Sequence, residues 1–282
     1  ENGFTHPLIG RKEDIKKITA QDIENFFKNQ FVSENTIITI QNGRDLTTSE
    51  MKEIEQIGKI FKPKQSENKF INPEFIKKKR IHHFTDNQIE GVSISLLFPQ
   101  THDKKLDYKH EVLEFLFRSV IRKISHDYLR EKLGLIYSAN LFNHSYLNFN
   151  ERFIGYEVTM QSKNLLKTLK AIDYIIEEKL EHFLKSKEGR VWFESIISGY
   201  IFPRNMPYKI DYAEHKGLAL IEDEEVFELD KAVNSALSIT IKDVIKFSKD
   251  FFKVSPLFWI ESDREDNRYI KMLKTSELYN RF

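Results

Sequence analysis

The residues that could do chemistry in this sequence gather in one short stretch, Asp127–Ala139, which reads DYLREKLGLIYSA. Arg130 falls in the last turns of an expected helix, Gly134 is a normal stop residue, and Tyr137 falls on the strand expected next. A guanidinium and a phenol placed across such a corner can reach the same end of a sheet. Both donate hydrogen bonds, and the guanidinium stays charged at any working pH, so they could hold a peptide carbonyl. The simpler alternative is an Arg that caps helix carbonyls and a Tyr that packs in the core.

The sequence contains no self-contained catalytic centre. It has 9 His, and no two of them are four residues apart, so it lacks the imidazole pair of a helical zinc site. His82 and His83 are neighbours on an expected strand, where they would point to opposite faces. Cysteine is absent, and so are a Gly-rich phosphate loop and a Gly-x-Ser-x-Gly turn. We therefore expect this chain to bind no metal or other cofactor and to be inactive by itself.

Composition excludes several other classes of protein. The 44 Lys and Arg are balanced by 43 Asp and Glu, which argues against a dedicated nucleic-acid-binding protein, because that class needs a concentrated positive surface. No apolar run approaches the roughly 18 residues that span a bilayer. The absence of cysteine permits a reducing compartment; the compartment stays open, with the cytoplasm favoured.

An internal repeat indicates how the chain is organised. Residues 18–31, ITAQDIENFFKNQF, match residues 239–252, ITIKDVIKFSKDFF, in register. Each copy begins with a Thr-x-x-Asp variant of the helix capping box, continues with apolar residues at helical spacing, and is followed by a short apolar strand. The first copy lies almost at the chain start and the second follows a long unit. We therefore expect residues 1–61 to be the tail of a first domain, residues 62–80 a linker, and residues 81–282 a complete, related second domain.

The expected fold class is α+β, an antiparallel sheet with helices packed on one face. In the second domain we expect residues 80–85 and 91–98 to be paired strands, with Val92, Ile94 and Leu96 facing inward. A long helix should follow through Val112 and Ile121, and Ser125 should cap a further helix that ends at Gly134. Further strands are expected around residues 135–145 and 152–160, and further helices at about 163–185, 188–203, 208–220 and 240–252.

The corner stretch carries a resemblance to a known family. Leu129-Arg130-Glu131-Lys132 followed by Gly134-Leu135 and Tyr137-Ser138 resembles the signature of the C-terminal, non-zinc domain of the M16 peptidases, which include pitrilysin, insulin-degrading enzyme and the mitochondrial processing peptidase. His6-Pro7-Leu8-Ile9-Gly10, then Ile18-Thr19 and Asp22, resembles the late part of the family's first domain. The similarity extends from about residue 5 to residue 262, and it accounts for the repeat, since this family is built from two homologous domains.

The resemblance implies a function. In this family the two domains enclose an unfolded peptide, and the zinc site lies in the first half of the first domain, outside these 282 residues. The second domain supplies an Arg and a Tyr that bind the substrate near the scissile carbonyl, which by position are Arg130 and Tyr137. The implied partners are a peptide or unfolded polypeptide, the N-terminal M16 domain of the same parent protein, and further copies of the chain. Neither nucleic acid nor a membrane span is expected.

A different class of function also fits the sequence. M16 proteins include subunits that kept the fold and lost the metal, so the chain could belong to a non-catalytic scaffold or partner subunit.

One further expectation concerns the exposure of residues in the isolated chain. Residues 1–61 would lack half of their core, so Phe26, Phe31, Ile37 and Ile38 should be partly exposed or shielded by a neighbouring chain. An exposed apolar surface of this kind favours association.

Overall fold

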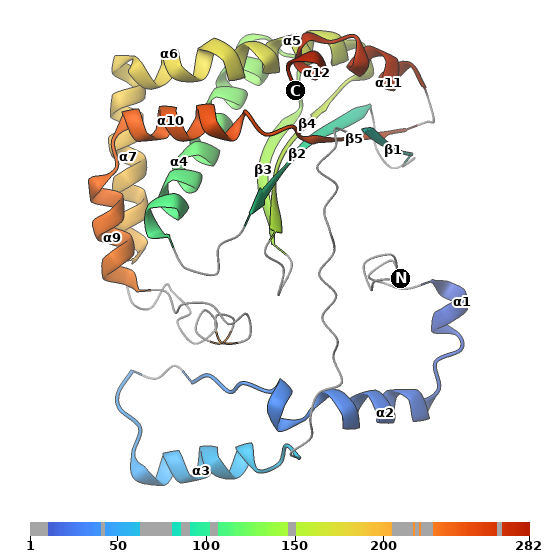
Figure 1. The fold of residues 1–282 in the computed structure, drawn as a ribbon, viewed down its shortest axis with the longest axis vertical. Helices are drawn as coiled ribbons and strands as arrows, with labels where there is room; N and C mark the ends of the chain where they lie inside the picture. Colours follow the sequence, from blue (N-terminus) through green and yellow to red (C-terminus); the bar gives the residue numbers. More distant parts are fainter. Residues whose placement is uncertain are drawn as a thin grey trace. The chain divides into compact units, whose positions relative to one another are not determined.

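The fold is described from a computed structural model (Figure 1). The described residues are 11–40, 43–62, 81–85, 91–101, 107–145, 151–204, 217, 220, 228–263 and 267–282. The chain divides into two compact units. The first comprises residues 1–74 and 211–227, and the second comprises residues 75–210 and 228–282.

The regular elements described in the first unit are helices. They are α1 (Lys12–Ile15), α2 (Ala20–Gln30), η2 (Ser33–Asn35) and α3 (Thr48–Gly58). Helix α2 begins with the capping box predicted from the sequence: the Thr19 hydroxyl accepts from the Asp22 amide, and the Asp22 carboxylate accepts from the Thr19 amide at 2.9 Å. Among the described hydrophobic residues of this unit, only Val32 is buried.

The second unit is built on a sheet whose strands run in the order β1-β5-β2-β4-β3. All neighbouring strands are antiparallel except β1 and β5, which are parallel. The strands are β1 (Ile81–Thr85), β2 (Val92–Thr101), β3 (Ser138–Ser145), β4 (Glu151–Met160) and β5 (Leu257–Ser262).

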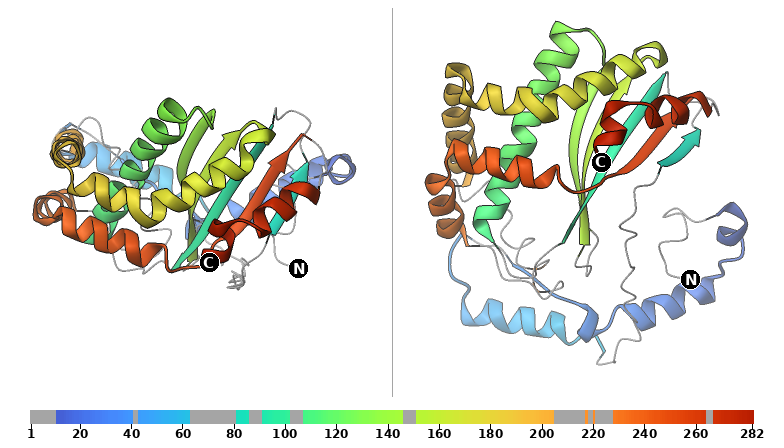
Figure 2. Two further views of the ribbon diagram at one scale, coloured as in Figure 1. Left: turned by 90° about the horizontal axis from the view of Figure 1, so that it is seen from above. Right: turned by 45° about the horizontal axis from the view of Figure 1, so that its top comes forward.

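One face of this sheet forms the core. Val92, Ile94, Leu96 and Phe98 are fully buried, as the alternation of the sequence predicts. Helices α5, α11 and α12 lie across the sheet, and α4 and α10 pack beside them (Figure 2). The helices of this unit are α4 (Tyr108–Ile124), η3 (Ser125–Lys132), η4 (Ser162–Asn164), α5 (Leu165–Tyr174), η5 (Ile175–Lys179), α6 (Leu180–Lys185), α7 (Lys187–Arg204), α9 (Leu229–Ser238), α10 (Ile241–Phe251), α11 (Asn267–Lys274) and α12 (Glu277–Arg281).

The second copy of the repeat is packed into this core. Helix α10 begins with the same capping box, formed by Thr240 and Asp243. The ring of Phe251 lies 4.7 Å from that of Phe98 on β2 and 4.5 Å from that of Phe117 on α4, measured between ring centroids. The strand that follows, β5, is an internal strand of the sheet, between β1 and β2. The α+β fold class is therefore confirmed, and the matching sequences form matching helices.

Three local predictions are wrong. The short strand expected after the first copy of the repeat is not formed, because residues 36–40 have no regular secondary structure. The strands near 80–85 and 91–98 exist as β1 and β2, but they do not pair with each other, because β5 lies between them. Ser125 does not cap a new helix: its backbone is α-helical, and α4 continues into the π-helical segment η3 without a break. Helices α9, α11 and α12 were not predicted, and the helix expected over 208–220 and the linker 62–80 lie almost entirely outside the described residues.

Candidate functional site

The corner around Gly134 is where the predicted site residues lie. Segment η3 ends at Lys132, and Gly134 takes a positive φ of +61°, a conformation that glycine adopts without steric cost. The Gly134 amide donates to the Arg130 carbonyl at 3.0 Å, and the Leu135 amide donates to the Leu129 carbonyl at 2.9 Å. These bonds satisfy helix-end carbonyls and turn the chain toward β3. Gly134 is thus the stop residue that the sequence predicts.

Buried residues hold both arms of the corner in place. Leu129 is completely buried before the turn, and Ile136 is nearly so after it. At the start of η3 the Ser125 hydroxyl lies 2.7 Å from the Tyr156 hydroxyl of β4, and both side chains are buried. Burial raises the pKa of the Tyr156 phenol, and its hydrogen bond with Ser125 opposes that shift only partly. The corner is therefore anchored to the core by buried side chains on both sides of the turn.

Arg130 and Tyr137 flank this corner with exposed side chains. The Arg130 side chain is 54% exposed, and its Nε lies 3.8 Å from a carboxylate oxygen of the neighbouring Glu131. Tyr137 is 49% exposed, and its amide donates to the Thr159 carbonyl of β4 at 2.8 Å, which fixes its backbone at the end of the sheet. The alternative in which this tyrosine packs in the core does not hold. Both donors are accessible from solvent.

The arrangement can donate hydrogen bonds, and the described part of the chain offers no metal centre. A charged guanidinium and a phenol can donate hydrogen bonds to a carbonyl oxygen or to the backbone of an extended peptide. Among the residues that the structure describes, no group of three or more His, Asp or Glu is placed to hold a metal ion. His83 lies 2.7 Å from the Ser262 hydroxyl, whereas His82 stacks on Trp259. The two therefore do not form a joint ligand pair. The described residues do not fit a zinc ion.

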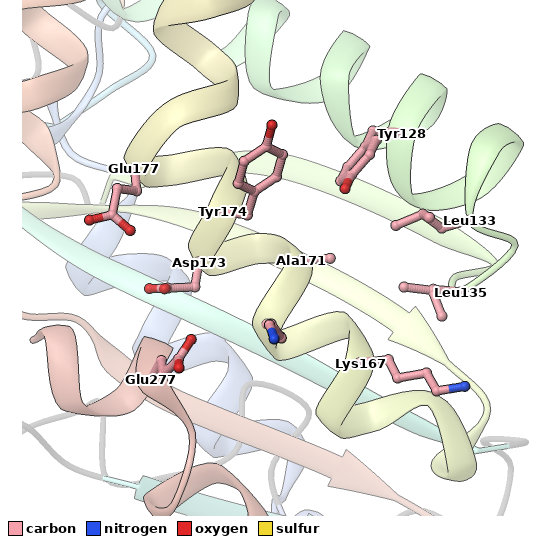
Figure 3. Close-up of a pocket in the computed structure, with 10 residues that line it drawn as sticks. Tyr128, Leu133, Leu135, Lys167, Ala171, Asp173, Tyr174, Glu177 and Glu277 are labelled. Carbon is pink, nitrogen blue, oxygen red and sulfur yellow. The ribbon is translucent and has the colours of Figure 1, made fainter.

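A pocket behind the corner was not predicted from the sequence. It lies between the corner and helix α5, with Tyr128, Leu133 and Leu135 on one side and Lys167 and Tyr174 on the other (Figure 3). Lys170 of α5 also lines it. The spacing of Lys167, Lys170, Tyr174 and Glu177 at three or four residues places them on one helix face and was the available signal. The facing tyrosine comes from a distant part of the sequence, which no spacing could indicate.

The described helices give no sign of a membrane crossing: none of them has the length and apolar character that a bilayer would require.

Comparison with known proteins identifies the family to which this fold belongs. Residues 17–188, more than half of the chain, match the family model of the peptidase M16 inactive domain. No curated protein matches the chain significantly. The crystal structure of a peptidase M16 inactive domain from Pseudomonas fluorescens is similar, with a TM-score of 0.68 at 14% identity, over 93% of this chain and 62% of that chain.

Two further solved structures share the fold. The periplasmic protease PqqL from Escherichia coli has a TM-score of 0.63 at 10% identity, over 94% of this chain and 30% of that chain. A chain of complex III from Candida albicans has a TM-score of 0.60 at 13% identity, over 95% of this chain and 65% of that chain. This chain thus spans about a third to two thirds of the length of these proteins. At such identities the likeness shows the fold alone.

The fold and the corner together define a metallopeptidase-like α+β domain whose described residues carry no metal site. The chain belongs to the peptidase M16 family and contains its inactive domain.

Proposed function

We propose that this chain is the substrate-binding, non-catalytic half of a zinc-dependent M16 endopeptidase. The observation that carries the proposal is the corner at Gly134, where Arg130 and Tyr137 present exposed hydrogen-bond donors on a buried support. Metal chemistry would come from another domain of the parent protein, since the described residues here do not fit a zinc ion.

In this proposal the two side chains act on the peptide backbone near the bond to be cleaved. Arg130 donates charge-assisted hydrogen bonds to an oxygen on which negative charge develops, and Tyr137 donates a neutral one. Both contacts also orient the peptide, because donors held on a rigid corner lower the entropy lost on binding. The chain alone would bind peptide without cleaving it.

The test is peptide cleavage by the full-length protein that contains these residues. Arg130→Ala should lower turnover by about 10²–10³-fold, the usual loss on removing one oxyanion donor. Tyr137→Phe should cause a smaller loss, because only a neutral donor is removed. The matched control is Arg190→Ala, which removes an exposed guanidinium of α7 and should leave turnover unchanged. Zinc content should be the same in every variant, which separates a substrate contact from a folding or metal-loading defect.

Full turnover in Arg130→Ala would refute the assigned role of this side chain. A rise in KM alone, with kcat unchanged, would limit Arg130 to ground-state binding.

A second candidate function is a non-catalytic scaffold or partner subunit. It is supported by the similar chain in complex III from Candida albicans, which is a component of that complex. Zinc binding and peptide cleavage by the full-length protein distinguish the two functions. A scaffold binds no zinc and cleaves no peptide, whatever residue stands at position 130.

We also propose that residues 1–61 are the C-terminal part of a first M16-like domain, residues 62–80 a linker and residues 81–282 the second domain. The support is the repeated helix, since α2 and α10 carry the same capping box and the same apolar spacing. The partner of residues 1–61 would then be the remainder of that first domain.

A further inference from the structure

A basic groove runs between α6 and α10 of the second unit, two helices that lie side by side (Figure 1). Its volume is about 450 Å³. Lys185 lines it from α6, and four further lysines line it from α10 and the residues directly after that helix: Lys242, Lys246, Lys249 and Lys253. These four recur every three or four residues, a spacing that keeps side chains on one face of a helix.

Positive charge exceeds negative charge in this groove. The described residues that line it carry five ammonium groups against two carboxylates, those of Glu181 and Asp250, which leaves an excess of three positive charges. All five lysines are exposed. The whole chain has a net charge of only +1, so the groove concentrates positive charge that is balanced elsewhere in the chain.

The two carboxylates hold three of the lysines in place. Glu181 lies 2.6 Å from Nζ of Lys185 and 2.7 Å from Nζ of Lys249, so it joins the two walls of the groove. Asp250 lies 2.6 Å from Nζ of Lys253. Both carboxylates are therefore already bound to ammonium groups of the groove.

The other two lysines, Lys242 and Lys246, are available to a partner. Neither forms an ion pair or a hydrogen bond with any residue that the structure describes. Lys242 lies in the first turn of α10, where the helix dipole disfavours a positive charge, and like charges four residues apart repel each other. The local energetics of the helix therefore do not explain these two lysines, and a bound anion would offset both unfavourable effects.

The first copy of the repeat shows that the helix forms without these lysines. In the register of the repeat, positions 242, 246 and 253 match Gln21, Asn25 and Val32, which are uncharged. Only Lys249 has a lysine, Lys28, at the matching position. Helix α2 nevertheless begins with the same capping box as α10. The row of lysines is thus specific to the second copy, which points to a role in binding.

We propose that the groove between α6 and α10 binds an extended acidic segment of a partner polypeptide. Lys242 and Lys253 are 11 positions apart, which corresponds to about 16 Å along a helix. An extended peptide advances about 3.3 Å per residue, so about five or six residues cover this length. Alternate side chains of such a peptide are about 6.6 Å apart, close to the rise of about 5.4 Å per helical turn, so alternate carboxylates can each reach a lysine.

The lining of the groove favours a polypeptide over a nucleic acid. Among the described residues that line it, there is no arginine and no aromatic side chain. Phosphates are bound preferentially by the fork of an arginine, and single strands by stacking of bases on aromatic rings. Separate ammonium groups suit separate carboxylates, and the partly buried Ile245 offers apolar contact between them. This surface would serve either function proposed above, because its lining residues do not include those of the corner at Gly134.

Fluorescence anisotropy with labelled hexaglutamate tests the proposal on the 282-residue chain. At about 50 mM NaCl we expect saturable binding of one peptide with a Kd on the order of 10–100 μM. At about 500 mM NaCl the binding should be at least tenfold weaker, because salt screens exposed charges. Labelled hexaglutamine, which has the same length and no side-chain charge, should not bind measurably.

The double variant Lys242→Gln/Lys246→Gln should weaken hexaglutamate binding about fivefold or more. Glutamine is a good helix former and stands at the matching position of α2, so the variant should keep the thermal stability of the parent chain. The matched control is Lys167→Gln/Lys170→Gln, which removes the same charge from two exposed positions of α5. It should leave the Kd for hexaglutamate unchanged within about twofold.

Equal weakening by the two double variants would overturn the proposal, since it indicates attraction to the overall charge without a site. Equal binding of hexaglutamine and hexaglutamate would overturn it as well, because charge would then play no part. A labelled oligothymidylate of the same charge tests the class of partner. We expect it to bind less tightly than hexaglutamate at the same salt concentration; tighter binding of the oligonucleotide would overturn the assignment to an acidic polypeptide.

Discussion

The buried pair of Ser125 and Tyr156 links the base of the corner to the sheet. Their oxygens are 2.7 Å apart, and neither side chain is accessible to water. Tyr156→Phe removes this hydrogen bond and leaves the Ser125 hydroxyl without its phenolic partner. The variant should lower the free energy of unfolding at pH 7 by about 1 kcal/mol. Urea unfolding followed by tryptophan fluorescence measures this change, because Trp192 and Trp259 both lie in the second unit, as Tyr156 does.

The same substitution should have an effect that depends on pH. Burial raises the pKa of Tyr156 above its ordinary value of 10.0, so the folded state keeps the phenolic proton at pH values where the unfolded chain releases it. The contribution of Tyr156 to stability is therefore complete below pH 10 and decreases as the pH rises above 10. The deficit of Tyr156→Phe should narrow above pH 10. Ser125→Ala, which keeps the buried phenol, should retain the alkaline loss; a deficit that is constant from pH 7 to pH 11 would contradict this account.

At the scale of elements, the two copies of the repeat show that the same local sequence pattern can be buried or exposed, depending on tertiary packing. Position 244 of α10 matches position 23 of α2 in the aligned sequences. Val244 is completely buried, whereas Ile23 is 62% exposed. Val244→Ala should lower the free energy of unfolding by about 2 kcal/mol, from lost burial and the cavity that remains. Ile23→Ala should change the tryptophan-monitored transition by about 0.5 kcal/mol or less. An equal loss in both variants would contradict the difference in burial.

Local features of these elements could be predicted from the sequence, and pairing between elements could not. The capping boxes at Thr19 and Thr240 and the stop at Gly134 depend on residues within a few positions, so their patterns are visible in the chain. The position of β5 between β1 and β2 depends on a segment more than 150 residues further along the chain. Ser125 was misassigned for a similar reason: its hydroxyl binds Tyr156 of β4 and caps no helix.

In the candidate site, too, local features could be predicted from the sequence and contacts between distant segments could not. Arg130 and Tyr137 could be found because they are only seven positions apart with Gly134 between them. The sequence did not show whether their side chains are exposed; the structure does. The pocket escaped prediction because Tyr128 meets Tyr174 from another helix.

At the scale of the whole molecule, the first unit exposes several large apolar side chains on α2 and after it. Phe26, Phe31, Ile37 and Ile38 are between 40% and 62% exposed, which confirms the expectation from the sequence. Phe27 is 58% exposed and stacks on Phe31 at 4.5 Å between ring centroids, so the aromatic residues of α2 cover one another only in part. The matching helix α10 covers its own aromatic residues with Phe98 and Phe117. Exposed apolar surface of this kind favours association with another surface.

The isolated 282-residue chain should therefore self-associate as its concentration rises. Sedimentation velocity from micromolar to about 100 μM should show a growing oligomer fraction, because association removes apolar surface from water. Phe26→Ser/Phe27→Ser should shift this equilibrium toward monomer and reduce binding of a hydrophobic dye. Leu237→Ser is the matched control: it removes one large apolar side chain that is 67% exposed on α9 of the second unit, and it should leave the association unchanged. If the parent chain stays monomeric across this range and binds no dye, the apolar face of α2 is covered within the chain and the expectation of association is wrong.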